Sequence, residues 1–261
     1  MFADDPWLPF ELAPGVQAAF TSRHGGVSAP PFETLNLGGG VGDDPAAVTS
    51  NRRLAAAVCG QSADAAAWMR QVHGPDVAYL AAGPLPSAGP VPSAGPVPSA
   101  APLPAVDAIF TDVPARTLGV LVADCAPVLI ADPRAGVIGA AHAGREGMAA
   151  GVVPALVRAM TGAGADPACM RAVIGPAICG SCYEVPAQLR ARITGAVPEA
   201  GCVTGKGSPG IDIGSGVAAQ LAAAGVRAVS RDPRCTAETP ALYSYRRDGR
   251  TGRFAGLIWL A

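Results

Sequence analysis

The chain has 261 residues, of which 50% are hydrophobic and 15% charged, and this is enough to bury a substantial core. Its formal net charge is −1 and its 19 basic residues are spread along the sequence, which argues against a nucleic-acid partner. No apolar run approaches the roughly 20 residues of a membrane-spanning helix, and the acidic N-terminus does not resemble a signal peptide. We therefore expect a cytoplasmic protein without a membrane partner.

The N-terminal part is predicted to contain a strand at residues 16–21 and a Gly-rich polar loop that carries Arg23 and Asn36. Paired glycines allow a ligand to approach the main chain, although a surface turn is the simpler interpretation. A helix should follow, with Asp44 as its cap, Pro45 at its first position and its end near Gly60. We place Arg52 on the polar face of this helix.

The next segment reads as two strands, AWMRQV and DVAYL, which are separated by His73, Gly74 and Pro75. A Pro-, Ala- and Gly-rich stretch follows at about residues 82–105, with SAGPVP occurring twice in tandem. Such spacing of proline blocks helices and sheet ladders. We interpret the stretch as an insertion loop in a single catalytic domain, residues 1–261, in preference to a ligand for a proline-recognition domain.

Three short apolar runs, LGVLVA, APVLIA and GVIGAA, follow the predicted strand VDAIFTD. Runs that are apolar on both faces are typical of a sheet covered on both sides. Asp124 and Cys125 close the first run and His142 closes the last. If the runs are neighbouring strands of one sheet, these side chains converge at its rim. The expected fold class is mixed α/β, with a mixed central sheet flanked by helices.

A helix is predicted after His142, with Pro154 kinking it or marking its start. Its N-terminus would present free N–H groups to an anion such as phosphate, with Arg145 nearby. Further helices at about 186–196 and 212–224, a strand at 226–230 and a last buried strand complete the chain.

The seven cysteines lack the spacing of a disulfide framework, so we expect free thiols, buried residues or metal ligands. Cys179 and Cys182 form a C-x-x-C pair in the loop after the strand at residue 171. One such pair is weak evidence for a metal or redox site, and a packed loop is the favoured interpretation.

His73, Cys125 and His142 make a two-histidine, one-cysteine set, which is a known arrangement for catalytic zinc. A Cys–His nucleophile pair or a fortuitous cluster remains an alternative, as does a blue-copper centre with Met69 as axial ligand. A multicopper centre is hard to sustain, because the whole chain has three histidines.

The motifs TSRHGG, QVHG, VDAIFTD, ADCAPVLIAD, HAG, IGPAICGSCYEV and YSYRRDGRTGRFAGLIWL occur in this order. Together they resemble the YfiH family, once called multicopper polyphenol oxidoreductases or laccases. The resemblance implies zinc bound by His73, Cys125 and His142. It also implies phosphorolysis of adenosine, inosine or methylthioadenosine to base and a ribose 1-phosphate, together with deamination of adenosine.

The resemblance leaves two other functions open. One is a copper-dependent, laccase-like oxidoreductase, with copper a less favoured cofactor than zinc; the other is a Cys–His hydrolase acting on peptidoglycan precursors. For deamination, Asp124 or Glu184 is the candidate proton carrier. The candidate substrate and phosphate groups are Arg23, Asn36, Arg52, Arg145 and Arg247.

This chain departs from the family pattern at two places. Where the family commonly reads HAGWRG, the chain has Arg145 and Glu146; Glu146 would repel phosphate, with Arg145 one position earlier as the possible substitute for the usual arginine. Ser181 replaces a cysteine in the IGP loop. We therefore expect zinc binding to be more secure than phosphorolysis.

Overall fold

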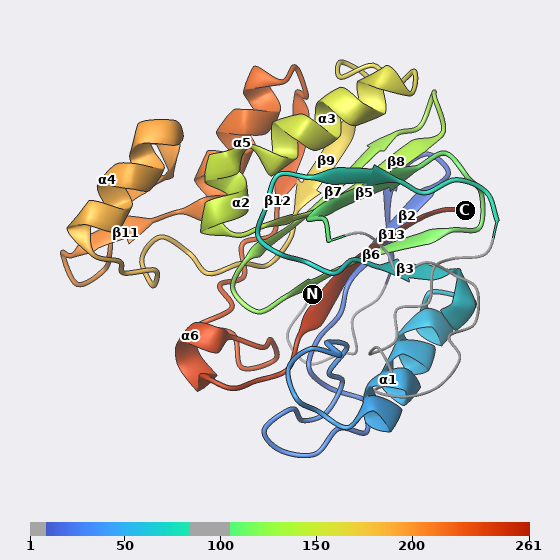
Figure 1. Cartoon of the computed structure of the whole chain (residues 1–261), viewed down its shortest axis with the longest axis horizontal. Coiled ribbons are helices and arrows are strands. Elements are labelled where there is room, and N and C mark those ends of the chain that lie inside the picture. The colour runs from blue at the N-terminus through green and yellow to red at the C-terminus, as the bar shows by residue number, and fades with distance from the viewer. Residues whose placement is uncertain (1–8, 84–104) are drawn as a thin grey trace.

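Two mixed β-sheets form the centre of the computed structural model, which describes residues 9–83 and 105–261 (Figure 1). The mixed α/β class predicted from the sequence is confirmed. The predicted insertion lies outside the described residues, apart from residues 82, 83 and 105. Within the described ranges, no helix is long and apolar enough to cross a membrane.

The smaller sheet has the strand order β1–β2–β13–β6–β3. Its strands are β1 (Phe10–Ala13), β2 (Val16–Phe20), β13 (Phe254–Leu260), β6 (Thr117–Val122) and β3 (Ala66–Trp68). β3 runs parallel to β6, and the other pairs are antiparallel.

The larger sheet has the strand order β12–β9–β7–β8–β5–β4. Its strands are β12 (Ala228–Arg231), β9 (Arg171–Ile174), β7 (Ala126–Asp132), β8 (Val137–Ala143), β5 (Ala108–Thr111) and β4 (Val77–Tyr79). The pairs β12–β9 and β4–β5 are parallel and the others antiparallel. A separate hairpin joins β10 (Gly201–Val203) to β11 (Pro209–Ile211).

The run APVLIA is apolar on both faces because β7 is covered on both sides. Val128 and Ile130 pack in the same cluster as Leu156 of the helical layer, whereas Leu129 joins the cluster between the two sheets. Alternate residues of a strand point to opposite faces, so an uninterrupted apolar run serves both. The helical layer is made of α2 (Arg145–Ala150), α3 (Val152–Gly162), α4 (Ala187–Ala196) and α5 (Ile213–Ala223) (Figure 1).

Helix α1 (Pro45–Val58) lies beyond the smaller sheet, on the side of the molecule opposite α3 and α5 (Figure 1). The predicted start is confirmed, since the Asp44 carboxylate caps the helix and Pro45 is its first residue. Arg52 differs from the prediction. Its guanidinium lies 4.7 Å from the centre of the Trp68 ring, and its Nε donates to the Leu37 carbonyl at 3.0 Å. It therefore packs against the protein and does not point into solvent.

The prediction that the three central apolar runs are neighbours in one sheet is wrong for the first run. β6 pairs with β13 and β3 in the smaller sheet, whereas β7 and β8 are neighbours in the larger one. The short connection that holds Asp124 and Cys125 consequently passes from one sheet to the other.

The helix predicted after His142 is divided in two at Gly151, whose φ of 85° is left-handed. Pro154 is the third residue of α3 and marks the start of that helix, as one of the two predicted alternatives has it. The remaining short elements are α6 (Tyr245–Asp248) and 3-10 turns at Ala63–Ala65 and Pro198–Ala200.

Candidate metal centre

The structure brings His73, Cys125 and His142 together where two chain connections pass from the smaller sheet to the larger one. His73 lies in the connection from β3 to β4, Cys125 in the connection from β6 to β7, and His142 in β8 itself. One ligand atom of each residue lies within 4.8 Å of the other two. The distance from Cys125 Sγ to His73 Nε2 is 3.9 Å.

The loop that carries His73 is held on both sides by side chains. The Gln71 amide spans to β6, donating to the Leu121 carbonyl at 2.7 Å and accepting from its N–H at 2.8 Å. Asp107 Oδ2 accepts from the N–H groups of Val72 at 3.0 Å and Gly74 at 2.8 Å. These bonds keep His73 at a φ of 63°, which a non-glycine residue adopts only when its surroundings impose it.

Asp107 also orients the buried His142. Its Oδ1 lies 2.8 Å from Nδ1 of the imidazole, which leaves Nε2 as the ring nitrogen available to a cation. A carboxylate behind a metal-binding histidine fixes the ring and raises its basicity. Asp107 is absent from the residues predicted for the site. Its position in VDAIFTD could have indicated a role in the site, because a carboxylate directly before a buried apolar strand needs partners of its own.

The electrostatics of the site favour a thiolate. Burial alone would raise the pKa of Cys125, but the neighbouring His142 and His73 outweigh it and lower the pKa to about 6. Burial likewise opposes the charged form of His142, yet the Cys125 sulfur and Asp107 raise its pKa to about 9. A thiolate is the form that binds metal ions and acts as a nucleophile.

Gly144 provides the space in which the ligands meet. A Cβ atom at this position would lie 2.8 Å from Cδ2 of His73 and 3.0 Å from Sγ of Cys125. Both distances are shorter than van der Waals contacts. The glycine of the HAG motif is therefore required by the close approach of two side chains.

The three side chains can hold a tetrahedral cation. Zn–S and Zn–N bonds of about 2.3 and 2.0 Å in a tetrahedral site place a sulfur and a nitrogen about 3.6 Å apart. The observed 3.9 Å between Cys125 and His73 is close to this value. Three protein ligands leave a fourth position for water or substrate.

Asp124, predicted as a catalytic carboxylate, has its oxygens turned towards the segment before β13. They accept from the hydroxyls of Thr236 and Ser244 and from the N–H of Arg246, each at 2.6 Å. Its φ of 96° directs the chain sharply into Cys125. The contacts show Asp124 joining the Cys125 turn to this segment. Glu184, the other predicted carboxylate, is exposed.

Arg145 and Glu146 lie in a cluster of charges beside the three ligands. Arg145 Nη1 donates to the Tyr183 hydroxyl at 2.7 Å, and its Nε donates to Glu146 at 3.2 Å. Arg192 of α4 binds both oxygens of Glu146, at 2.7 and 2.9 Å. Arg192 also lowers the pKa of Glu146, so the carboxylate stays ionised. Two guanidinium groups thus compensate the negative charge of Glu146.

Three other predicted substrate residues mainly bind their own loops. Arg23 donates to the Glu33 carbonyl and lies over the Tyr243 ring. Asn36 is fully buried and uses both ends of its amide on neighbouring groups, including Gly38. Arg247 donates to three backbone carbonyls of residues 236–242 and to Asp248.

Two arginines that were not predicted lie near the site. The Arg246 guanidinium lies 5.0 Å from the centre of the Tyr183 ring, on the same side chain that Arg145 contacts. Arg253 is close enough to Cys125 and Asp124 for their charges to raise its pKa, although burial lowers it overall. Both residues belong to the C-terminal motif YSYRRDGRTGRF. This motif contains several arginines, and the sequence alone does not show which of them lie near the site.

The fold and the site together define a mixed α/β protein with a candidate mononuclear metal centre. The family described as multi-copper polyphenol oxidoreductase laccase matches residues 17–261, and the chain belongs to it. The predicted family is thereby confirmed.

Known relatives and a solved structure match this chain over nearly its whole length. The chain is 51% identical to a purine nucleoside phosphorylase of Streptomyces coelicolor, covering 94% of this chain and 96% of that protein. It is 43% identical to a purine nucleoside phosphorylase of Mycobacterium tuberculosis, covering 94% and 92%. The crystal structure of YlmD from Geobacillus stearothermophilus superimposes with a TM-score of 0.85 and 31% identity, covering 100% of this chain and 98% of that one.

Proposed function

We propose that this protein is a zinc-dependent purine nucleoside phosphorylase. The observation that carries the proposal is the His73–Cys125–His142 set, held by Asp107, in a chain that matches purine nucleoside phosphorylases along nearly its whole length. The substrates are adenosine, inosine and methylthioadenosine, and the products are the free base and the corresponding ribose 1-phosphate.

Zinc suits the ligand set better than copper does. Two imidazoles and one thiolate with an open position form a known catalytic zinc arrangement, in which the ion acts as a Lewis acid. Multicopper chemistry needs more ligands than this chain supplies, since it has three histidines and His24 lies in the Arg23 loop. We therefore assign the metal as zinc, despite the copper in the family's description.

Phosphorolysis forms a bond between a phosphate oxygen and the ribose C1′ and breaks the bond from C1′ to the base, which takes up a proton. Arg145 and Arg246, which converge on Tyr183, are the groups proposed to bind phosphate and hold it for in-line attack. Arg192 neutralises Glu146, so that Arg145 keeps a net attraction for the anion. Arg23, Asn36, Arg52 and Arg247 are then residues that support the surrounding loops.

The test is incubation of the purified protein with adenosine or inosine, with and without inorganic phosphate, followed by chromatography. Adenine and hypoxanthine should form only when phosphate is present, each with an equal amount of ribose 1-phosphate. Cys125→Ala should lose one zinc per chain together with the activity, whereas Cys169→Ala, which changes a thiol elsewhere, should keep both. Absence of any base from either nucleoside would refute the proposal.

Deamination of adenosine, in which water replaces the C6 amino group and ammonia leaves, is proposed as a second reaction at the same site, because an ion held by His73, Cys125 and His142 would supply Lewis-acid activation of water. The same incubation detects it as inosine formed without phosphate. The three hydrogen bonds that Asp124 already accepts favour a positioning role for this residue over proton transfer.

A Cys–His hydrolase is the alternative function, and the contact between His142 and Asp107 favours it. Cys125, His142 and Asp107 follow one another as nucleophile, base and orienting carboxylate would. In that mechanism His73 has no role, so His73→Asn should leave the activity intact. In the metalloenzyme the same change should remove one zinc per chain together with the activity.

A further inference from the structure

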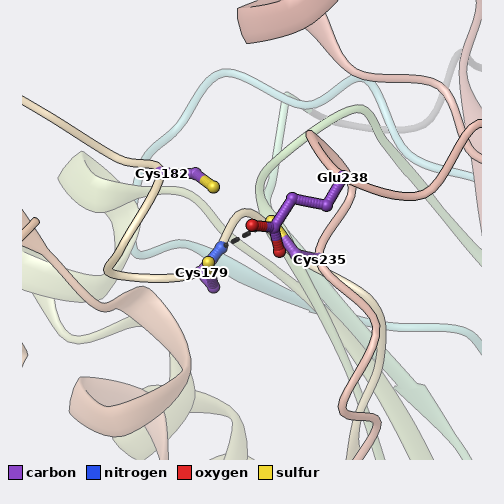
Figure 2. Close-up of side chains that lie close together, drawn as sticks. All are labelled: Cys179, Cys182, Cys235 and Glu238. Carbon is purple, nitrogen blue, oxygen red and sulfur yellow. Dashed lines mark hydrogen bonds between the residues drawn. The ribbon is translucent and has the colours of Figure 1, made fainter. Parts of the chain in front are cut away.

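A second group of side chains that could hold a metal ion lies in two loops, and the proposed reaction uses none of these side chains. Cys179 and Cys182 come from the loop after β9, and Cys235 and Glu238 from the loop after β12 (Figure 2). One ligand atom of each residue lies within 4.8 Å of the other three. Cys235 is buried, the other two cysteines are half-buried, and Glu238 is exposed.

The parallel pairing of β9 with β12 brings these residues together across more than fifty positions of sequence. The pairing continues beyond the strands, since Asp232 N–H donates to the Ile174 carbonyl at 2.8 Å and Ala177 forms a parallel bridge with Cys235. The N–H of Cys179 then donates to Cys235 Sγ at 3.3 Å, as the dashed line in Figure 2 marks.

The two loops make the same kind of turn. The N–H of Cys182 donates to the carbonyl of Cys179 at 3.0 Å, and the N–H of Glu238 donates to the carbonyl of Cys235 at 3.2 Å. Each turn therefore presents two ligand side chains three residues apart. This is the short ligand spacing found in structural zinc sites, where two such turns face each other.

We propose that Cys179, Cys182, Cys235 and Glu238 form a second, structural zinc site. Three thiolates and one carboxylate complete a four-coordinate set, which leaves no position for substrate. The thiolates select zinc over magnesium or calcium, and the carboxylate suits zinc better than copper(I). Binding displaces the protons that the thiols carry when they are neutral.

The site would stabilise the metal centre next to it. Both loops contact Asp124, the residue before Cys125: the N–H of Ile178 donates to its carbonyl at 2.9 Å, and the Thr236 hydroxyl donates to its carboxylate at 2.6 Å. An ion that joins the two loops therefore fixes two of the contacts that position the Cys125 turn.

Metal content measured in a chain that lacks the first site tests this proposal without any nucleoside assay. Cys125→Ala, purified with a reductant and dialysed against metal-free buffer, should retain one zinc per chain. The double variant Cys125→Ala/Cys182→Ala should retain almost none, and the matched control Cys125→Ala/Cys169→Ala should retain one. Wild-type protein should then carry two.

Cobalt(II) added to the apo form of Cys125→Ala gives a second measurement. It leaves all four side chains of the second site in place, so it does not depend on how Cys182→Ala affects folding. We expect the visible bands of a tetrahedral ion and a near-ultraviolet thiolate-to-cobalt band. Glu238→Gln should keep the thiolate band, shift the visible bands and weaken binding about 10-fold or more. The proposal is overturned if folded Cys125→Ala holds no zinc and shows no thiolate band. A disulfide among these cysteines in protein purified with a reductant, seen by mass spectrometry, would overturn it equally.

Discussion

Replacing Gly144 by alanine should separate the metal ligands without straining the backbone. Gly144 has a φ of −77° and a ψ of 171°, a conformation that alanine adopts freely. The added methyl group would nevertheless lie 2.8 Å from Cδ2 of His73 and 3.0 Å from Sγ of Cys125. The substitution thus acts on the ligands alone.

The size of the effect follows from these distances. Relaxed contacts of carbon with carbon or sulfur lie at about 3.5–4.0 Å, so His73 and Cys125 must each move by roughly 0.5–1 Å. Metal–ligand distances tolerate changes of only about 0.2 Å. We expect zinc affinity to fall at least about 10- to 100-fold, which corresponds to roughly 1.4–2.8 kcal/mol.

Competition with a chromophoric chelator measures this affinity when every chain compared also carries Cys182→Ala, so that zinc binds at the first site alone. Gly195→Ala in α4, where nothing lies within 4 Å of the added Cβ, is the matched control and should bind zinc as the wild type does. If Gly144→Ala binds zinc with unchanged affinity, the three side chains do not form the site we describe.

Three further predictions concern the same region. Asp107→Asn should lower zinc affinity about 10- to 100-fold in the chelator assay, because an amide has one acceptor oxygen for three donors; native affinity would contradict the orienting role. Arg145→Gln should raise the KM for phosphate about 10-fold with zinc content unchanged, since a charged hydrogen bond is lost, and an unaltered KM would remove Arg145 from the phosphate site. In chelator-treated protein, iodoacetamide should alkylate Cys125 with a midpoint near pH 6, because the two imidazoles outweigh burial and lower its pKa to about 6. Cys169, whose pKa is raised by burial and by Asp166, should react only above its ordinary 9.0. A midpoint near the ordinary 9.0 would contradict the lowered pKa of Cys125.

Local signals predicted helix α1 well. Its cap and its first residue, Asp44 and Pro45, act within one turn, and the chain beyond Gly60 plays no part in them. The division of strands between two sheets could not be predicted in this way. LGVLVA and APVLIA are apolar on both faces whichever sheet they enter, so the pattern of β6 and β7 contains no information about their partners.

The sequence pattern also could not show which of the polar residues bind substrate and which bind the protein itself. The sequence singled out His73, Cys125 and His142 as candidate metal ligands because few residue types bind metal and the chain has few histidines, and the structure brings them together. Arginine and asparagine bind backbone as readily as substrate, and only the fold shows which carbonyls lie within their reach. Asn36 and Arg247 were predicted to bind substrate because of their residue type, yet neighbouring groups occupy both ends of the Asn36 amide and every nitrogen of the Arg247 guanidinium.

Cys235 shows a further limit. The C-x-x-C pair Cys179–Cys182 was visible as a local motif, but its partners lie more than fifty residues away in the sequence. They become neighbours only through the parallel pairing of β9 with β12, both short strands without a distinctive pattern.

His73 and Cys125 lie in connections that pass from one sheet to the other, so the proposed metal binding would affect the stability of the whole molecule. An ion bound by these residues would tie the two sheets together, and the chain could not open between them without releasing it. Zinc at a thousand times its dissociation constant would add about 4 kcal/mol to the free energy of unfolding. The temperature at which the protein melts would therefore vary with the zinc supply of its surroundings, even if the enzyme is not turning over substrate.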